Sequence, residues 1–217
     1  MPLDEPAQDP MLSNPMLSNS MSLDPMLAGR RLLVIGGGSG MGLATATLAA
    51  ERGARVAATA GSPDRLQACL DLGADIAIDY HDDIAEQLKK ATDGHGADVI
   101  LDNMGAKGLP NNVAALASDG RLMVIGMQGG VKAELNLGVL LSKRASVTAM
   151  GLRGRPVEGP NSKALVVAGV REEVWPMFAD GRVKPIVHAR FPLRDAAEAH
   201  RMLDAGGVVG KLLLVNE

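Results

Sequence analysis

The residues best suited to chemistry in this sequence are the glycines of one short stretch, residues 36–42, which reads Gly-Gly-Gly-Ser-Gly-Met-Gly. The apolar run Leu32–Ile35 precedes it and is typical of a strand buried on both faces. Glycines let the backbone turn tightly and approach a phosphate at a helix N-terminus. We interpret the stretch as a pyrophosphate-binding loop that offers backbone N–H groups and one hydroxyl. Its members are Gly36, Gly38, Ser39, Gly40, Met41 and Gly42.

The residue after this loop excludes one class of nucleotide site. A P-loop needs a lysine directly after its last glycine, and this sequence has Leu43 there. Chemistry at a γ-phosphate is therefore not supported.

A second candidate loop follows about 20 residues later, where an NAD-specific site carries an acidic residue for the ribose hydroxyls. Here residues 58–65 read Ala-Thr-Ala-Gly-Ser-Pro-Asp-Arg. Gly61 and Ser62 leave room for a 2′-phosphate to which Ser62 can donate, and the Arg65 guanidinium can reach it from the next helix. The pattern favours NADPH over NADH. The alternative is that Arg65 is a solvated helix residue.

The elements that must position these loops alternate regularly along the chain. Apolar runs alternate with amphipathic segments that end in glycine, which predicts parallel βαβ crossovers and a doubly wound α/β sheet, the Rossmann dinucleotide-binding fold. We predict strands at Leu32–Gly36, Arg55–Thr59, Ile76–Ile78, Ala97–Leu101, Arg121–Ile125 and, at one edge, Ser146–Met150. We predict helices near residues 40–52, 63–72, 82–92, 109–117 and 162–179.

The glycine spacing alone also suits short-chain dehydrogenases, which need a catalytic Tyr-x-x-x-Lys. The one tyrosine, Tyr80, is followed four positions later by Ile84, so that chemistry is excluded.

Several stretches together resemble the zinc-free NADPH:quinone oxidoreductases of the medium-chain dehydrogenase/reductase superfamily. The resemblance extends over residues 30–217 and is specific as an ordered series. It is carried by residues 36–42, 58–63, 72–75, 78–80, 94–105, 120–126, 152–156, 191–193, 197–200 and 210–214.

This resemblance implies roles for single residues. Ser39, Gly40 and Met41 would bind the pyrophosphate, and Gly61, Ser62, Arg65 and Tyr80 would surround the 2′-phosphate and adenosine. Asn103 and Gly105 would lie beside the ribose and nicotinamide, and Gly126, Met127 and Gln128 would face the nicotinamide ring. Tyr80 as a partly buried core residue and Asn103 as a turn cap are the structural alternatives. The family often pairs two subunits along the last strand, which makes residues 146–150 the expected homodimer edge, unless a loop covers it.

The sequence departs from the family at its beginning. Family members start with a catalytic lobe, whereas residues 1–29 here are a low-complexity tail in which Pro-Met-Leu-Ser-Asn occurs twice in succession. We expect the tail to be disordered or loosely docked. We expect a dinucleotide-binding domain over residues 30–157, and over residues 158–217 a helix followed by the returning part of the catalytic lobe, with strands near 185–189 and 212–215.

Composition limits the partners. A net charge of −3 gives no reason to expect nucleic acid, and no run approaches the ~18 apolar residues of a membrane span. Asp4 and Glu5 at the start do not suit a signal peptide, and a single cysteine, Cys69, fits a cytoplasmic protein.

The other reactive side chains predict no metal site. The four histidines lack acidic or cysteine partners at metal-ligand spacing, so surface or local hydrogen-bonding roles are expected. Cys69 is expected to be inert packing, and Trp175 and Phe178, three residues apart on one helix face, are expected in the core.

Two functions from different classes follow. The first is a zinc-independent, NADPH-dependent reductase that transfers hydride to a quinone or conjugated enone; no catalytic residue can be named. The second is a non-catalytic NADPH-binding module that acts as a sensor or partner subunit, because half of the family's substrate cleft has no counterpart in this sequence.

Overall fold

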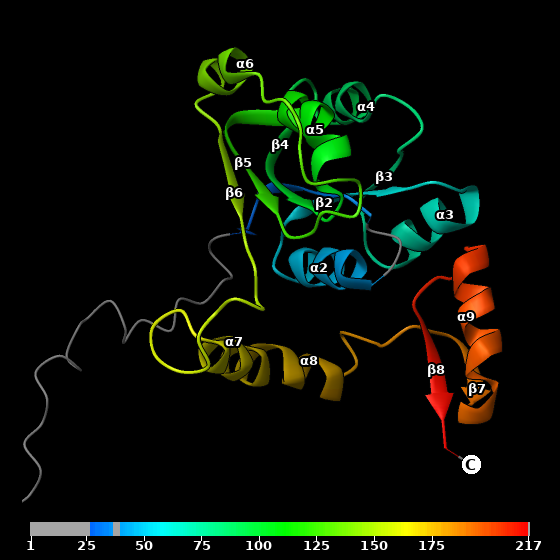
Figure 1. Cartoon of the computed structure of the whole chain (residues 1–217). Helices are drawn as coiled ribbons and strands as arrows, with labels where there is room; N and C mark the ends of the chain where they lie inside the picture. Colours follow the sequence, from blue (N-terminus) through cyan, green and yellow to red (C-terminus); the bar gives the residue numbers. More distant parts are fainter. Residues whose placement is uncertain (1–26, 37–39, 217) are drawn as a thin grey trace, which may run out of the picture.

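The core of the protein is one six-stranded parallel sheet. The computed structural model describes residues 27–36 and 40–216. Its strands lie in the order β3-β2-β1-β4-β5-β6, and every neighbouring pair runs parallel (Figure 1). This confirms the predicted doubly wound fold, with β6 at an edge. The strands are β1 (Arg31–Val34), β2 (Arg55–Ala60), β3 (Ile76–Asp79), β4 (Ala97–Asp102), β5 (Leu116–Val124) and β6 (Ser146–Ala149).

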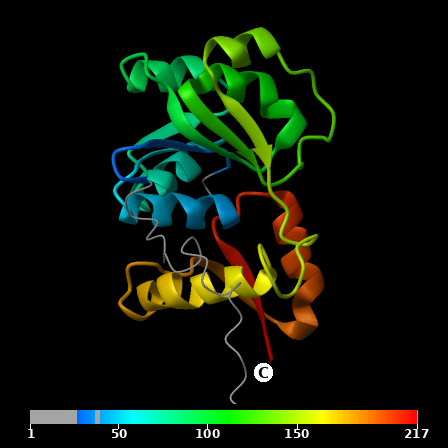
Figure 2. The same ribbon diagram turned by 90° about the vertical axis from the view of Figure 1, so that its left-hand side faces the viewer.

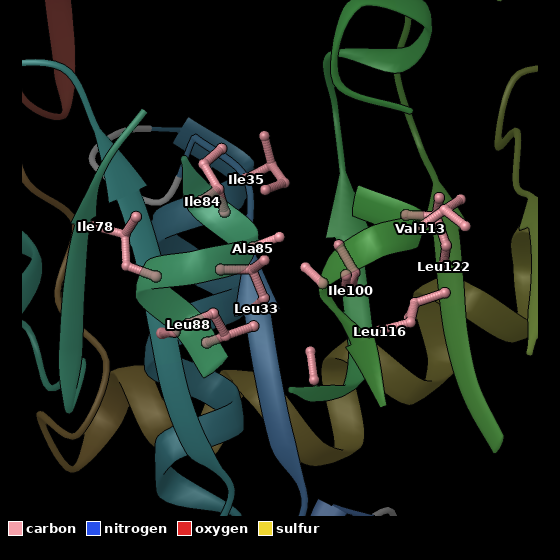
Figure 3. Packing of buried hydrophobic residues seen from close by; sticks show 13 residues of the cluster. Leu33, Ile35, Ile78, Ile84, Ala85, Leu88, Ile100, Val113, Leu116 and Leu122 are labelled. Atoms are coloured by element: carbon pink, nitrogen blue, oxygen red, sulfur yellow. The ribbon is translucent and has the colours of Figure 1, made fainter. Parts of the chain in front are cut away.

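Helices cover both faces of the sheet because its strands are apolar on both faces. Alternate side chains of β1 pack into the helix layers on the two faces of the sheet. Leu33 belongs to the same buried cluster as residues of α4 (Ile84–Ala91) and α5 (Leu109–Ala115), which Figure 3 shows. Leu32 and Val34 pack with residues of α2 (Gly40–Glu51) and α3 (Pro63–Asp71). Cys69 of α3 is buried in this second layer, and burial raises the pKa of its thiol, which confirms the packing role.

The ends of these helices follow from local sequence. Pro63 occupies the start of α3, where its fixed φ and missing N–H cost nothing. The Asp83 side chain accepts a hydrogen bond from Glu86 N at 3.0 Å and so caps the N-terminus of α4. At the C-terminal end of α5, Lys143 Nζ donates to the carbonyl oxygens of Val113, Ala114 and Leu116 at 3.1, 2.7 and 2.6 Å.

Strand β5 begins at Leu116 rather than at the predicted Arg121. Leu116 already pairs with Ala97, and the register then shifts before Arg121 pairs with Val99. Asp119, with φ +62°, interrupts the alternation of apolar residues that would have marked the strand. A 2.8 Å hydrogen bond from each of Arg144 Nε and Nη2 to the Asp119 carboxylate holds this irregular segment.

The helix predicted over residues 162–179 is present but is not uniform. It consists of α7 (Lys163–Gly169), a π-helical turn, η3 (Val170–Val174), and α8 (Trp175–Ala179). A π turn accommodates Pro176, which cannot donate to the preceding turn. The prediction that Trp175 and Phe178 are core residues is wrong, because they are 62% and 45% exposed while Met177 between them is buried. The two rings do share a helix face, with a centroid distance of 6.2 Å, but that face is turned to solvent.

The C-terminal segment forms a small separate layer. Strands β7 (Val187–Pro192) and β8 (Lys211–Val215) pair in parallel, joined by η4 (Leu193–Asp195) and α9 (Ala196–Ala205). Both predicted strands exist, although β7 starts after Pro185, which lacks an N–H for a ladder. In Figures 1 and 2 this layer and helix α7–α8 lie on the α2 side of the main sheet. The sequence interpretation missed α9, and also α6 (Leu137–Ser142) just before β6.

Candidate functional site

The predicted site residues come from the carboxyl ends of four strands of the main sheet. Gly36 follows β1, Gly61 follows β2, Asn103 follows β4, and Gly126 follows β5 closely. Because all strands run parallel, these ends lie at one edge of the sheet. The strand order reverses between β1 and β4, which is where ligands bind to doubly wound sheets.

A buried hydroxyl fixes the start of the glycine loop. Gly36 has φ +77°, which suits glycine, and its N–H donates to Thr59 Oγ1 at 2.9 Å. Thr59 is fully buried near the end of β2, so it ties the β1 loop to the neighbouring strand. Helix α2 then begins at Gly40. The predicted contacts of Gly38 and Ser39, and those of the Met41 side chain, lie outside the described residues.

The second loop forms a compact group with Tyr80. A Cβ atom placed on Gly61 would overlap the Tyr80 hydroxyl and ring, so only glycine allows this contact. Tyr80 is 49% exposed, which argues against its being a core residue. Arg65 is half-buried, and its Nε atom is buried without a hydrogen-bond partner in the described structure. Ser62, also half-buried, precedes α3 in an extended conformation.

Asn103 faces the glycine loop from β4. A Cβ atom on Gly36 would lie 3.2 Å from both Oδ1 and Nδ2 of Asn103. The Oδ1 atom is buried and accepts no hydrogen bond from any described residue. Unpaired buried polar atoms are uncommon in native proteins and often indicate a missing ligand or water.

The loops after β4 and β5 are joined to each other through the backbone. Gln128 N donates to Asn103 O at 3.2 Å, and Gly129 N donates to Met104 O at 2.7 Å. Gly105, with φ +73°, is buried between the loops, whereas the Met127 side chain is 61% exposed. The predicted nicotinamide residues Asn103, Gly105, Gly126, Met127 and Gln128 therefore form one connected unit.

A fully buried carboxylate, Asp102, sets the shape of the β4 loop. It accepts hydrogen bonds from Met104 N at 2.7 Å and from Gly105 N at 3.1 Å. Burial raises the pKa of the Asp102 carboxyl, against the opposing effect of these N–H groups. The turn-capping role that was the alternative for Asn103 thus belongs to Asp102. Sequence reasoning missed Asp102 and Thr59, although an acidic residue that ends an apolar strand three residues before a glycine is a usable signal for Asp102.

The residues at this edge fit an NADP-type dinucleotide. The backbone of Gly36 and Gly61 is in close contact with the Asn103 amide and the Tyr80 ring, and Arg65 Nε and Asn103 Oδ1 are buried and unpaired within the described ranges. A cationic fork suits a 2′-phosphate, and an amide suits ribose or carboxamide groups. No acidic side chain follows β2 in the loop Gly61–Ser62.

Metal ligands do not gather anywhere in residues 27–36 and 40–216, where no three His, Cys, Asp or Glu side chains form a group able to hold an ion. His81 and His95 instead bond locally to Asp79 and Asp98, at 2.7 and 2.9 Å. The same part of the chain has no helix with the length and apolar character needed to span a bilayer.

Comparison with known proteins identifies relatives of this site and fold. The family model described as zinc-binding dehydrogenase matches residues 40–163. Quinone oxidoreductase of Rattus norvegicus is 30% identical over 190 residues, which are 87% of this chain and 55% of that protein. Quinone oxidoreductase of Mus musculus is 30% identical over 193 residues, 87% of this chain and 55% of that protein.

A solved structure is also similar to this chain. The Escherichia coli quinone oxidoreductase complexed with NADPH has a TM-score of 0.74 and 28% identity, and the match covers 87% of this chain and 57% of that chain. The chain thus spans about half the length of the rat and E. coli proteins. Since the family model matches more than half of the 217 residues, the protein belongs to the zinc-binding dehydrogenase family, as a quinone-oxidoreductase-like member of the medium-chain dehydrogenase/reductase superfamily.

Proposed function

We propose that the protein binds NADPH along the carboxyl edge of the main sheet and uses it to reduce a quinone or a conjugated enone. The observation that carries the proposal is the pair of buried, unpaired polar atoms at this edge, Arg65 Nε and Asn103 Oδ1, among the described residues. Each costs free energy until a ligand or a water molecule satisfies it.

The adenosine end of the cofactor is assigned to the group after β2. Gly61 allows the Tyr80 ring to lie against the backbone, and the Arg65 guanidinium pairs with the 2′-phosphate by charge-assisted hydrogen bonds, with Ser62 as a further donor. NADH lacks that phosphate and leaves the guanidinium without its anionic partner. We therefore expect NADPH to bind more tightly than NADH.

The pyrophosphate is assigned to the loop from Gly36 to Gly42, and the nicotinamide end to Asn103, Gly105, Gly126, Met127 and Gln128. When bound, NADPH supplies the hydride for the reduction. The loop residues orient the ring and exclude water from its neighbourhood, so their contribution to rate is positioning rather than proton transfer. No side chain of the described site is assigned as a general acid.

The relatives support a reductase. One of them is named quinone oxidoreductase, and a solved structure of another contains NADPH. These names describe those proteins, of which this chain spans about half, and the acceptor of this protein is proposed by analogy with them.

A second candidate function is NADPH binding without turnover, as a sensor or partner subunit. The observation that favours it is the C-terminal layer, where the two-stranded β7–β8 sheet leaves Leu214 42% exposed and Leu193 54% exposed.

We also propose a homodimer through β6. This strand ends the order of the main sheet, and three of its four residues are exposed. An exposed strand edge with free N–H and C=O groups favours pairing with a second copy. Sedimentation equilibrium checks this proposal: a dimer mass supports it, and a monomer mass at all concentrations contradicts it.

The test has two steps. In the first step, NADPH is titrated with the protein and binding is followed by NADPH fluorescence. In the second step, NADPH oxidation is followed with p-benzoquinone and with cyclohexenone as acceptors. A parallel reaction with Arg65→Ala in place of the wild type is the control. Binding with protein-dependent oxidation supports the reductase. Binding without oxidation of either acceptor supports the second candidate, and no binding contradicts both.

A further inference from the structure

We infer that Asp102 is a positioning residue for the nicotinamide end of the cofactor site: its buried carboxylate shapes the loop that presents Asn103. The inference rests on the proposed function, because only a bound dinucleotide gives this loop a ligand to meet.

The carboxylate of Asp102 is placed to define one tight turn. It is fully buried at the end of β4. Its Oδ1 atom accepts hydrogen bonds from Met104 N at 2.7 Å and Gly105 N at 3.2 Å, and its Oδ2 atom accepts from Gly105 N at 3.1 Å. Two successive N–H groups are thereby directed back at the strand, and the chain turns around Asn103.

This turn determines where the Asn103 amide lies. Asn103 is the one residue between the acceptor, Asp102, and the first donor, Met104, so its backbone is fixed on both sides. Its amide is held 3.2 Å from the Cβ position that Gly36 leaves empty, with Oδ1 buried and unpaired among the described residues. The free acceptor is therefore presented at the glycine loop, where the proposed cofactor crosses from β1 to β4.

The same turn holds the loop after β5. Asp102 O accepts from Ile125 N at 2.7 Å, and Gly130 O accepts from Ala106 N at 3.1 Å. A Cβ atom on Gly105 would lie 2.9 Å from Gly130 O and 3.1 Å from Gly126 O, so the two loops are packed at backbone contact. A change in the Asp102 turn is transmitted to both loops that face the nicotinamide ring.

Packing alone does not explain a carboxylate at this position. Burying a charged group costs free energy, and a neutral side chain fills a core position at lower cost. The Asn112 amide of α5 lies beside the carboxylate and favours its charged form, although it is outside ordinary hydrogen-bond geometry. The charge is stabilised by the two loop N–H groups, which is the arrangement expected if the turn is what the residue maintains.

The chain provides a matched control on the same strand. Asp98, near the start of β4, accepts a hydrogen bond from Arg31 N at 2.7 Å. Like Asp102, it is an acidic residue that binds backbone N–H, but it lies near the opposite end of the strand from the site. Replacing Asp98 tests the general cost of losing such a carboxylate.

The experiment compares two ligands by isothermal titration calorimetry: NADPH, and 2′,5′-ADP, which contains only the adenosine end. The proteins are the wild type, Asp102→Ala, the conservative Asp102→Asn and the control Asp98→Ala. The measured quantity is the ratio of the Kd for NADPH to the Kd for 2′,5′-ADP. We expect Asp102→Ala to raise this ratio about tenfold over the wild type, the size expected from losing hydrogen bonds to a charged group. Asp102→Asn, which keeps one acceptor oxygen, is expected to raise the ratio less, and Asp98→Ala is expected to leave it unchanged.

The outcomes separate the two claims. If Asp102→Ala lowers the melting temperature but weakens both ligands equally, Asp102 is only structural and the inference is wrong. If Asp102→Ala does not fold, Asp102→Asn decides: an unchanged ratio contradicts the inference, and a raised ratio supports it. If the wild type binds 2′,5′-ADP as tightly as NADPH, there is no nicotinamide contact to position and the inference is wrong. If it binds neither ligand, the proposed function itself fails.

Discussion

The Tyr80 ring lies directly against the backbone of Gly61, in the space that any side chain at position 61 would occupy. Gly61 follows β2 and Tyr80 follows β3, whose last residues Ala60 and Asp79 pair in register. Tyr80 N donates to Ala60 O at 3.1 Å, which fixes the tyrosine at the strand end. The contact makes the proposed adenosine side of the site depend on one glycine.

Gly61→Ala is expected to weaken NADPH binding about tenfold, because a methyl group forces Tyr80 out of its place and overpacking of this kind costs roughly 1–3 kcal/mol. The measurement is a fluorescence titration with NADPH. The matched control is Gly151→Ala, since no heavy atom lies within 4 Å of a Cβ at Gly151. Equal affinities of the wild type and Gly61→Ala would show that the Tyr80 position does not matter for the cofactor.

Asp98 is expected to make the free energy of unfolding depend on pH in the acidic range. Burial raises the pKa of its carboxyl, but the Arg31 N–H and the His95 ring outweigh burial, so the net pKa is lowered. A carboxyl group whose pKa is lower in the folded protein than in the unfolded chain, where it is about 3.9, stabilises the fold at pH values above the unfolded pKa. This stabilisation is lost as the pH falls through the folded pKa. We expect Asp98→Asn to be less stable than the wild type at neutral pH by about 1–2 kcal/mol. Urea unfolding curves of the two proteins are expected to converge on acidification, and a constant difference at all pH values would contradict this account.

Two glycines with open space around them are expected to respond in opposite directions to alanine. Gly169, the last residue of α7, has φ −60° and ψ −40°, whereas Gly206, after α9, has φ +78°. No heavy atom lies within 4 Å of a Cβ at either position. Gly169→Ala is expected to stabilise the protein by about 0.5–1 kcal/mol through helix propensity. Gly206→Ala is expected to destabilise it by about 1–3 kcal/mol, because φ +78° with ψ −169° is a backbone conformation essentially restricted to glycine. Thermal unfolding measures both, and the same sign for both would be inconsistent with this conformational argument.

The sheet and the meeting of the candidate loops at one of its edges were predictable because their signals are local. Buried parallel strands are apolar runs such as Leu32–Ile35, and glycines such as Gly36 and Gly61 are needed where a side chain packs against the backbone. The order of the strands then brings these loops to one edge without further information.

What could not be predicted depends on tertiary contacts. Thr59 accepts a hydrogen bond from Gly36 N, which is remote in sequence, and nothing near Thr59 in the sequence indicates that partner. The three-residue spacing correctly places Trp175 and Phe178 on one helix face, because their rings are in contact. That this face is exposed depends on how the helix packs, which the spacing does not indicate.

The measurement that tests the central claim most directly is the binding of NADPH and NADH to the wild type and to Arg65→Ala, with Arg55→Ala as the control. Arg55 is exposed at the opposite end of β2 from the site. The account predicts that Arg65→Ala weakens NADPH at least about tenfold, as expected for losing a charge-assisted contact, and leaves NADH nearly unchanged. Arg55→Ala is expected to affect neither. Equal weakening of both cofactors by Arg65→Ala, or no NADPH binding by the wild type, would contradict the assignment of this edge as an NADPH site.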